Sequence, residues 1–148
     1  MEFFTVSLFG HREIDDLRQL DCKILPLIRE LIQTKSYVSF LIGRNGEFDE
    51  YTASVIKRVQ KSTGKENNEL VLVLPYYVAN LEYYEKYYDS VTIPERVCGV
   101  HYKVALTERN RWMVEQSDLV MVYLERDNGG AYKAMKYAES LGKRIIKI

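Results

Sequence analysis

Residues 118–141 read DLVMVYLERDNGGAYKAMKYAESL, and this stretch decides the fold class. Its first seven residues are almost entirely apolar, which is typical of a strand that is buried on both faces. A glycine-containing loop follows, and from Gly129 to Leu141 the apolar residues recur at helical spacing. A buried strand that leads into an amphipathic helix predicts one unit of a parallel α/β sheet.

The same alternation of short apolar runs and longer helical patterns extends over the rest of the chain. Apolar runs predict further strands at residues 4–9, 37–42, 70–74 and 143–148. Helical spacing predicts helices at residues 15–34, 48–62 and about 106–116. A short tyrosine-rich helix and an extended piece near residues 90–92 follow the third strand. With right-handed crossovers, the pattern predicts one domain, residues 1–148, with a Rossmann-like, doubly wound parallel sheet of about five strands in the order 3-2-1-4-5, flanked by helices.

The charge of the chain is balanced, with 21 Lys and Arg residues against 21 Asp and Glu residues. Domains that bind nucleic acid generally are strongly basic, so the balance predicts no general nucleic-acid binding, although it leaves room for a local basic patch. A net charge of zero also gives little protection against self-association. We therefore expect a homodimer or a higher oligomer.

The cysteine and histidine content, together with the hydropathy, excludes several kinds of site. Cys22 and Cys98 form no CxxC pair and His11 and His101 are the only histidines, so we expect no metal site. Two reduced cysteines are typical of a cytoplasmic protein. No apolar run approaches the ~20 residues of a membrane span, and the first ten residues do not form a signal peptide. The sequence predicts no cofactor and no membrane partner.

The loops that follow the predicted strands are where we expect a ligand, because open α/β sheets bind ligands outside the carboxyl ends of their strands. Glycines there allow close approach to the backbone, arginine pairs with phosphate, and a glycine-rich helix start leaves N–H groups free for an anion. In the alternative reading the glycines only make turns and the arginines are solvated. The candidate ligand-binding residues in these loops are Gly10, His11, Arg12, Gly43, Arg44, Asn45, Gly46, Pro75, Tyr76, Asn128, Gly129 and Gly130.

Three further residues are candidates for chemistry. Arg109 lies in the predicted helix before the fourth strand, from which it could reach the ligand over the sheet edge. Glu47 and Asp49 follow the second strand and could bind ribose hydroxyls. Acidic residues in the first turn of a helix also stabilise the helix dipole, which is the structural alternative for Asp49.

Six of the 12 tyrosines lie between Tyr76 and Tyr88. Aromatic residues at helical spacing are more often core or interface groups than base-stacking groups. The segment therefore fits a core, an oligomer surface or a lid over a ligand.

Several of these segments, in their order and spacing, resemble the SLOG superfamily, named for the Smf/DprA and LOG proteins, and in particular its small bacterial YpsA-like branch. The resemblance covers nearly the whole chain. It rests on Phe9–Arg12, on Gly43, Gly46 and Asp49, on Leu74–Tyr76, on Arg109–Val114, and on Gly129–Gly130 with the helix that follows.

The resemblance implies a Rossmann-like fold that binds nucleotides or molecules derived from them. LOG proteins resemble phosphoribohydrolases, and their arginine before the fourth strand corresponds to Arg109. Their glutamate after the glycine pair has no counterpart, because Gly129–Gly130 is followed by AYKAMK. Only Glu47 or Asp49 could substitute for it as the carboxylate that N-glycosidic cleavage needs.

Three functions follow from these observations. The main hypothesis is a sensor or carrier that binds a nucleotide or an ADP-ribose-like small molecule. The first alternative is a nucleotide N-glycosidase that uses Arg109 with Glu47 or Asp49. The second alternative is a macromolecular interaction module with a tyrosine-rich surface and a vestigial pocket.

Overall fold

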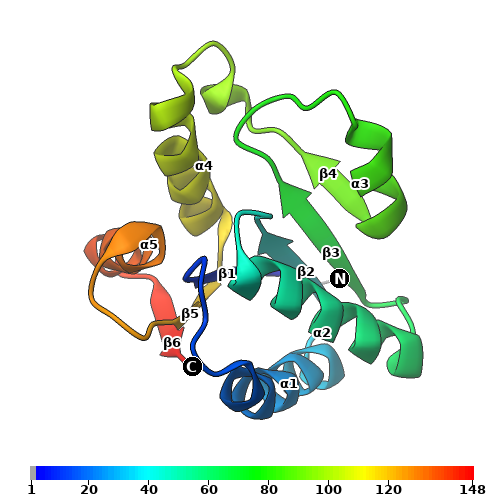
Figure 1. Cartoon of the computed structure of the whole chain (residues 1–148). Helices are drawn as coiled ribbons and strands as arrows, with labels where there is room; N and C mark the ends of the chain where they lie inside the picture. The colour runs from blue at the N-terminus through cyan, green and yellow to red at the C-terminus, as the bar shows by residue number, and fades with distance from the viewer. Residues whose placement is uncertain (1–2) are drawn as a thin grey trace.

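The computed structural model describes residues 3–148. They form a six-stranded sheet with all neighbours parallel, in the order β4-β3-β2-β1-β5-β6 (Figure 1). The strands are β1 (Phe3–Gly10), β2 (Tyr37–Ile42), β3 (Asn68–Val73), β4 (Ser90–Thr92), β5 (Leu119–Tyr123) and β6 (Arg144–Lys147). The helices are α1 (Leu17–Thr34), α2 (Glu47–Thr63), α3 (Leu81–Tyr87), α4 (Tyr102–Gln116) and α5 (Gly129–Ser140), with a 3₁₀ turn at Glu95–Val97.

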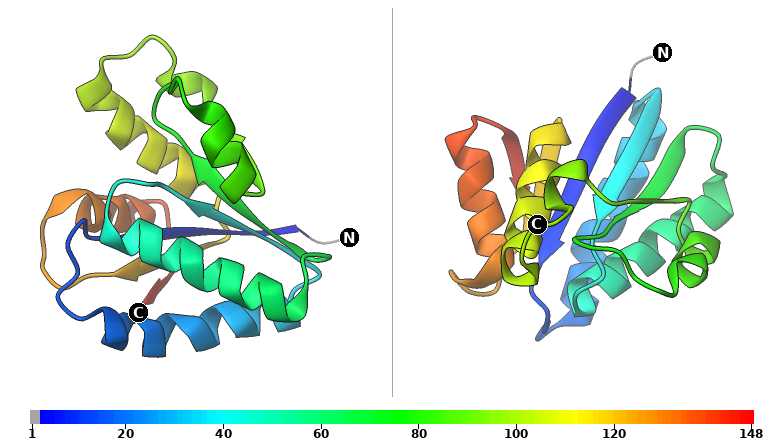
Figure 2. Two further views of the ribbon diagram at one scale, coloured as in Figure 1. Left: turned by 45° about the vertical axis from the view of Figure 1, so that its right-hand side comes forward. Right: turned by 90° about the horizontal axis from the view of Figure 1, so that it is seen from above.

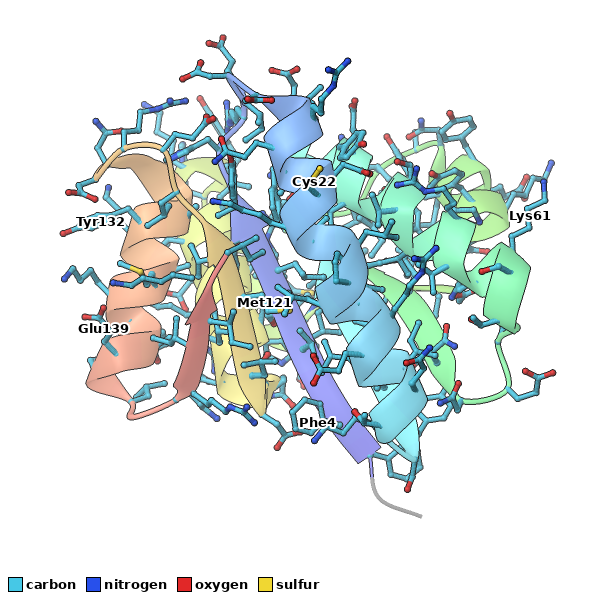
Figure 3. The ribbon with its side chains drawn as sticks, turned by 90° about the horizontal axis from the view of Figure 1, so that it is seen from below. Phe4, Cys22, Lys61, Met121, Tyr132 and Glu139 are labelled. Atoms are coloured by element: carbon cyan, nitrogen blue, oxygen red, sulfur yellow. The ribbon has the colours of Figure 1, made fainter. Side chains whose placement is uncertain are left out.

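Helices cover both faces of the sheet, which explains the continuous apolar runs of its strands. On one face α1 and α2 pack against the sheet, and α4 and α5 pack against the other (Figure 2). In β5, Leu119 and Met121 belong to the core under α1 and α2, whereas Val120 and Val122 belong to the core under α4 and α5. Figure 3 shows the α1 side, with Met121 beside that helix. A strand buried on both faces has no polar side to alternate with.

The Rossmann-like sheet expected from the sequence is confirmed. The predicted order 3-2-1-4-5 is present as β3-β2-β1-β5-β6, and the extended piece near residues 90–92 adds the short edge strand β4. Helix α4 begins at Tyr102, earlier than the predicted start at about residue 106. The cause is His101, whose side chain accepts a hydrogen bond from the N–H of Lys103 and so caps the added turn.

The strand order reverses beside β1, and this reversal places the site. The chain leaves β1 for α1 on one face of the sheet and leaves β5 for α5 on the other face. The two loops therefore diverge from neighbouring strands and leave a crevice at the carboxyl ends, as in other doubly wound sheets.

Two further observations concern membrane helices and metal sites in the described part of the chain. No helix within residues 3–148 is long and apolar enough to cross a membrane. Over the same residues, no three His, Cys, Asp or Glu side chains come together in a group that could hold a metal ion.

Candidate functional site

A pocket of about 460 Å³ opens at the carboxyl ends of β1, β2 and β5, under α4 and the start of α5. Most residues proposed from the sequence line it, and they come from loops far apart in the chain. These lining residues are Gly10, His11, Arg12, Gly43, Asn45, Gly46, Asp49, Arg109, Asn128, Gly129 and Gly130.

Four of the proposed residues lie outside the lining. The Glu47 carboxylate accepts a hydrogen bond from the N–H of Ile14 at 3.1 Å, which holds the loop after β1 in place. Pro75 is buried behind the pocket, and Tyr76 lies on the surface with 42% of its area exposed. Arg44 follows Gly43 of the pocket, and its guanidinium lies over the Tyr84 ring, 5.2 Å from its centroid.

Two glycines are required by the packing of the chain itself. A Cβ on Gly10 would overlap the ring of Phe48 and come within 2.7 Å of its Cβ, and Phe48 is fully buried. A Cβ on Gly46 would overlap the backbone of Arg12. Both glycines therefore let the loop after β1 pack against the start of α2, whatever they do for a ligand.

The start of α2 is not the free anion site that its glycines suggested. The N–H of Glu47 donates to the carbonyl of Arg12 at 2.8 Å, and the N–H of Phe48 donates to the carbonyl of His11 at 3.4 Å. The N–H of Asn45 donates to the Asp49 carboxylate at 3.0 Å. The protein thus satisfies these donors, and the loop after β2 positions side chains rather than a phosphate.

The start of α5 is open. Asn128 occupies the N-cap position without a side-chain hydrogen bond to the helix. Within residues 3–148, the N–H groups of Gly129, Gly130 and Ala131 have no hydrogen-bond acceptor. Gly129 has φ +88°, a conformation that strongly favours glycine. The free N–H groups and the helix dipole together make this end of the pocket favourable for an anion.

Arg109 is the buried cation of the pocket, with 4% of its area exposed. Its Nη1 donates to the carbonyl of Val73 at 2.9 Å, and its Nε donates to the Asn110 side chain at 2.9 Å. No carboxylate among residues 3–148 lies within ion-pairing distance of it. Burial lowers the pKa of Arg109, which expresses the cost of keeping this charge away from water.

Asp49 is the acid nearest to this cation. A Cβ on Gly43 would lie 2.7 Å from Nη1 of Arg109 and 3.0 Å from Oδ2 of Asp49, so both groups border the same glycine. Burial raises the pKa of Asp49, while its hydrogen bond from Asn45 and the charge of Arg109 act in the opposite direction. The raised pKa means that this carboxylate is a poorly solvated partner, and it does not form a close ion pair with Arg109.

Two donors in the pocket were missing from the sequence-based site. The Oδ1 of Asn110 accepts from Arg109, which turns its amide group toward α5, where Nδ2 would lie 3.8 Å from a Cβ on Gly130. Arg126 lines the pocket and donates from its Nη2 to the carbonyl of Glu13 at 3.0 Å. Arg126 lies in the loop after β5, so the expectation that ligands bind outside the carboxyl ends of the strands could have found it.

His11 joins the loops after β1 and β5. Its Nε2 accepts a hydrogen bond from the N–H of Arg126 at 3.3 Å, and the side chain is 7% exposed. Burial and the Arg126 charge lower the pKa of His11. A neutral ring that accepts at Nε2 carries its proton on Nδ1, so the histidine supplies one more donor in the pocket wall.

Donors and cations therefore outnumber carboxylates in this pocket, which suits it to bind an anion. Of the two acids proposed for glycosidic cleavage, only Asp49 lines the pocket. Glu47 is engaged by the backbone of Ile14, and Asp49 carries the hydrogen bond from Asn45.

No family model and no curated protein sequence matches this chain. Two solved structures share its fold. DNA processing protein A from Helicobacter pylori superimposes with a TM-score of 0.63 at 16% sequence identity, over 96% of this chain and 63% of that one. DNA processing protein A from Streptococcus pneumoniae gives 0.57 at 13% identity, over 98% and 59%. The chain thus spans less than two thirds of the length of either protein. These matches show a shared fold, as the resemblance to the Smf/DprA–LOG superfamily implied.

The comparison corrects the expected partner. The Helicobacter pylori structure is described for its single-stranded DNA binding mode. The prediction of a nucleotide-like small molecule as partner, without general nucleic-acid binding, is therefore wrong: a protein with this fold binds single-stranded DNA. Its physical error was to treat the zero net charge as an exclusion, although phosphate contacts depend on where the cations lie. The expected oligomer stays a prediction.

Proposed function

We propose that this chain is a module that binds single-stranded DNA, with the phosphate backbone held in the pocket at the carboxyl ends of β1, β2 and β5. The observation that carries the proposal is Arg109, a buried guanidinium that lines the pocket without a carboxylate in ion-pairing distance among residues 3–148. Burying a charge is costly unless an opposite charge compensates it. A phosphate in the pocket would supply that compensation.

The other donors support the same ligand. Arg12 and Arg126 are exposed lining residues, and the open N-terminus of α5 lies in the same wall. Because this wall faces solvent, a polymer can enter and leave the pocket without threading through the protein. Arginine and main-chain N–H groups are the donors that most often contact nucleic-acid phosphates.

The test measures binding of a fluorescently labelled oligo-dT strand by fluorescence anisotropy. We expect Arg12→Gln and Arg126→Gln each to weaken binding by about tenfold, because each removes a charge-assisted hydrogen bond. The matched control is Arg29→Gln. Arg29 is an exposed arginine in the second half of α1, without a hydrogen bond or ion pair within residues 3–148.

Thermal melting of each variant separates lost binding from lost folding. If the wild-type chain does not bind the strand at low salt, the proposal is wrong. It is also wrong if Arg29→Gln weakens binding as much as Arg12→Gln does, since the attraction would then be unrelated to the pocket.

We also propose that the chain belongs to the YpsA-like branch of the SLOG superfamily and acts in the cytoplasm. Support for the branch comes from the sequence motifs, whose glycines fall at the carboxyl ends of β1 and β2 and at the start of α5. Cytoplasmic location is supported by two cysteines that are both free and exposed.

A further inference from the structure

Five tyrosines of the described residues are exposed to solvent. Single exposed aromatic residues need no explanation, so their position decides whether they act together. The exposed tyrosines are Tyr76, Tyr77, Tyr83, Tyr87 and Tyr102, with Tyr102 at 62% and Tyr76 at 42%. Tyr102 lies on a helix that lines the pocket, and Tyr76 lies in the loop that follows β3.

Tyr102 extends the wall that α4 presents to the pocket. Leu106 and Arg109 of this helix line the pocket, and Tyr102 lies one turn before Leu106 on the same face. Its ring stacks on His101, with centroids 4.7 Å apart and an angle of 29°. His101 is itself held by the hydrogen bond from Lys103. One face of the Tyr102 ring is thus supported, and 62% of the residue stays exposed.

Tyr76 lies on the surface, in the loop that follows β3. Arg109 bonds the carbonyl of Val73, which ends β3, and Tyr76 follows three residues later. The segment between β3 and α3 arches beside the upper part of α4 in Figure 1 and Figure 2.

Arg44 supplies a cation on the same rim. It follows Gly43 of the pocket, and its guanidinium lies over the Tyr84 ring at 5.2 Å. Burial lowers the pKa of Arg109, and the charge of Arg44 acts in the same direction. The Nε of Arg44 is buried without a hydrogen-bond partner within residues 3–148. The rim therefore combines aromatic rings with positive charge, as single-strand binding proteins do.

We infer that this rim is a base-stacking track, in which Tyr102 and Tyr76 stack the bases next to the phosphate held in the pocket. The inference rests on the function proposed above and adds the part of the strand that the rim would bind. Rings recognise any base by its flat face, so the track would select unpaired strands with little sequence preference. Bases in a duplex are stacked on one another and are not available to it.

The experiment compares an oligo-dT strand with an abasic strand of the same length, which has the same phosphates and no bases. We expect the wild-type chain to bind oligo-dT more tightly, by about fivefold or more for each stacked base. Tyr102→Ala should remove about that factor for oligo-dT and leave the abasic strand unaffected. Tyr102→Phe keeps the ring and should keep the affinity.

The control variant is Phe3→Ala. Phe3 is 67% exposed and lies at the amino-terminal end of β1, whereas the pocket lies at the carboxyl ends of the strands. This variant should bind both strands as the wild type does. A DNA duplex of the same length should bind more weakly than the single strand.

The outcomes separate the two proposals. If neither strand binds, the proposed function fails, and the stacking track fails with it. If both strands bind equally, and Arg12→Gln weakens both while Tyr102→Ala weakens neither, the pocket holds the backbone and the stacking track alone is overturned. Equal binding of duplex and single strand would also overturn the track.

Discussion

The salt dependence of DNA binding follows directly from the three arginines that line the pocket. Arg12, Arg109 and Arg126 can each neutralise one phosphate and release its counterion. For single strands, log K falls against log salt with a slope of about −0.7 per neutralised phosphate, so three contacts predict about −2. A rise in monovalent salt from about 50 to about 200 mM should then weaken binding roughly 20-fold.

A single substitution should change this slope by a defined amount. Arg126→Gln leaves two pocket arginines, and we expect a slope of about −1.4. Arg29→Gln should leave the slope at about −2, because Arg29 lies on the second half of α1, away from the pocket. The assay is fluorescence anisotropy of a labelled oligo-dT strand. The strand is longer than ~16 nucleotides, the upper end of the range that a single-strand site on one OB-fold domain covers.

Two results would refute this reasoning. A wild-type slope near zero would mean that binding, if present, does not depend on phosphate contacts. A slope much steeper than about −2, and equally reduced by Arg29→Gln, would mean that cations over the whole surface attract the strand. In that case the pocket would not be the binding site.

Three further predictions concern the residues around the pocket. Gly10→Ala should lower the free energy of unfolding by about 1–3 kcal/mol in urea titrations, because the added Cβ would overlap the buried Phe48 ring. An unchanged urea midpoint would contradict the argument that Gly10 is required for packing against Phe48. Asp49→Asn should bind oligo-dT more tightly, since it removes a negative charge beside Arg109, and weaker binding would give the acid a direct role instead. Since burial raises the pKa of Asp49, the folded state disfavours its ionised form, so the same variant should be more stable than the wild type at neutral pH. It should lose that advantage as the pH falls through the raised pKa of the folded state to the usual aspartate range. Burial lowers the pKa of His11, so the unfolded chain binds a proton at this residue more readily than the folded chain, and thermal stability should fall as the pH drops through about 6.5. The variant His11→Gln can still accept the hydrogen bond from the N–H of Arg126 and should reduce that fall in stability. An identical pH profile of the variant and the wild type would exclude His11 as its source.

Hydrophobic pattern predicted most of the sheet because its strands are buried on both faces. The run at residues 118–124 has no polar side, and β5 (Leu119–Tyr123) is buried at each position. The edge strand β4 (Ser90–Thr92) shows where the hydrophobic pattern no longer identifies a strand. It has three half-buried residues, and what makes it a strand is its pairing with Val71–Val73 of β3. That partner is distant in sequence and leaves no local pattern.

The place of the pocket could be predicted, but the task of each residue in it could not. The expectation of a ligand at the carboxyl ends of the strands pointed to Gly10, Gly43 and Gly129, and all three line the pocket. Which helix start keeps free N–H groups depends on how loops pack. The carbonyl of Arg12 reaches the first N–H of α2, whereas the corresponding groups of α5 meet no acceptor within residues 3–148. Two glycine-containing loops with similar sequences therefore differ in what they can bind.

The wrong prediction of the partner shows that the charges around a site matter more for its ligand than the net charge of the chain. Net charge sums 21 positive and 21 negative side chains over the whole chain, but in physiological salt the interaction of an exposed charge is screened over about 8 Å. A concave site therefore responds to its own few charges. Arg12, Arg109 and Arg126 converge there, while Glu47 is engaged by the Ile14 backbone. A chain with balanced charge can therefore have a pocket with more cations than acids: three arginines line this one beside Glu13 and Asp49.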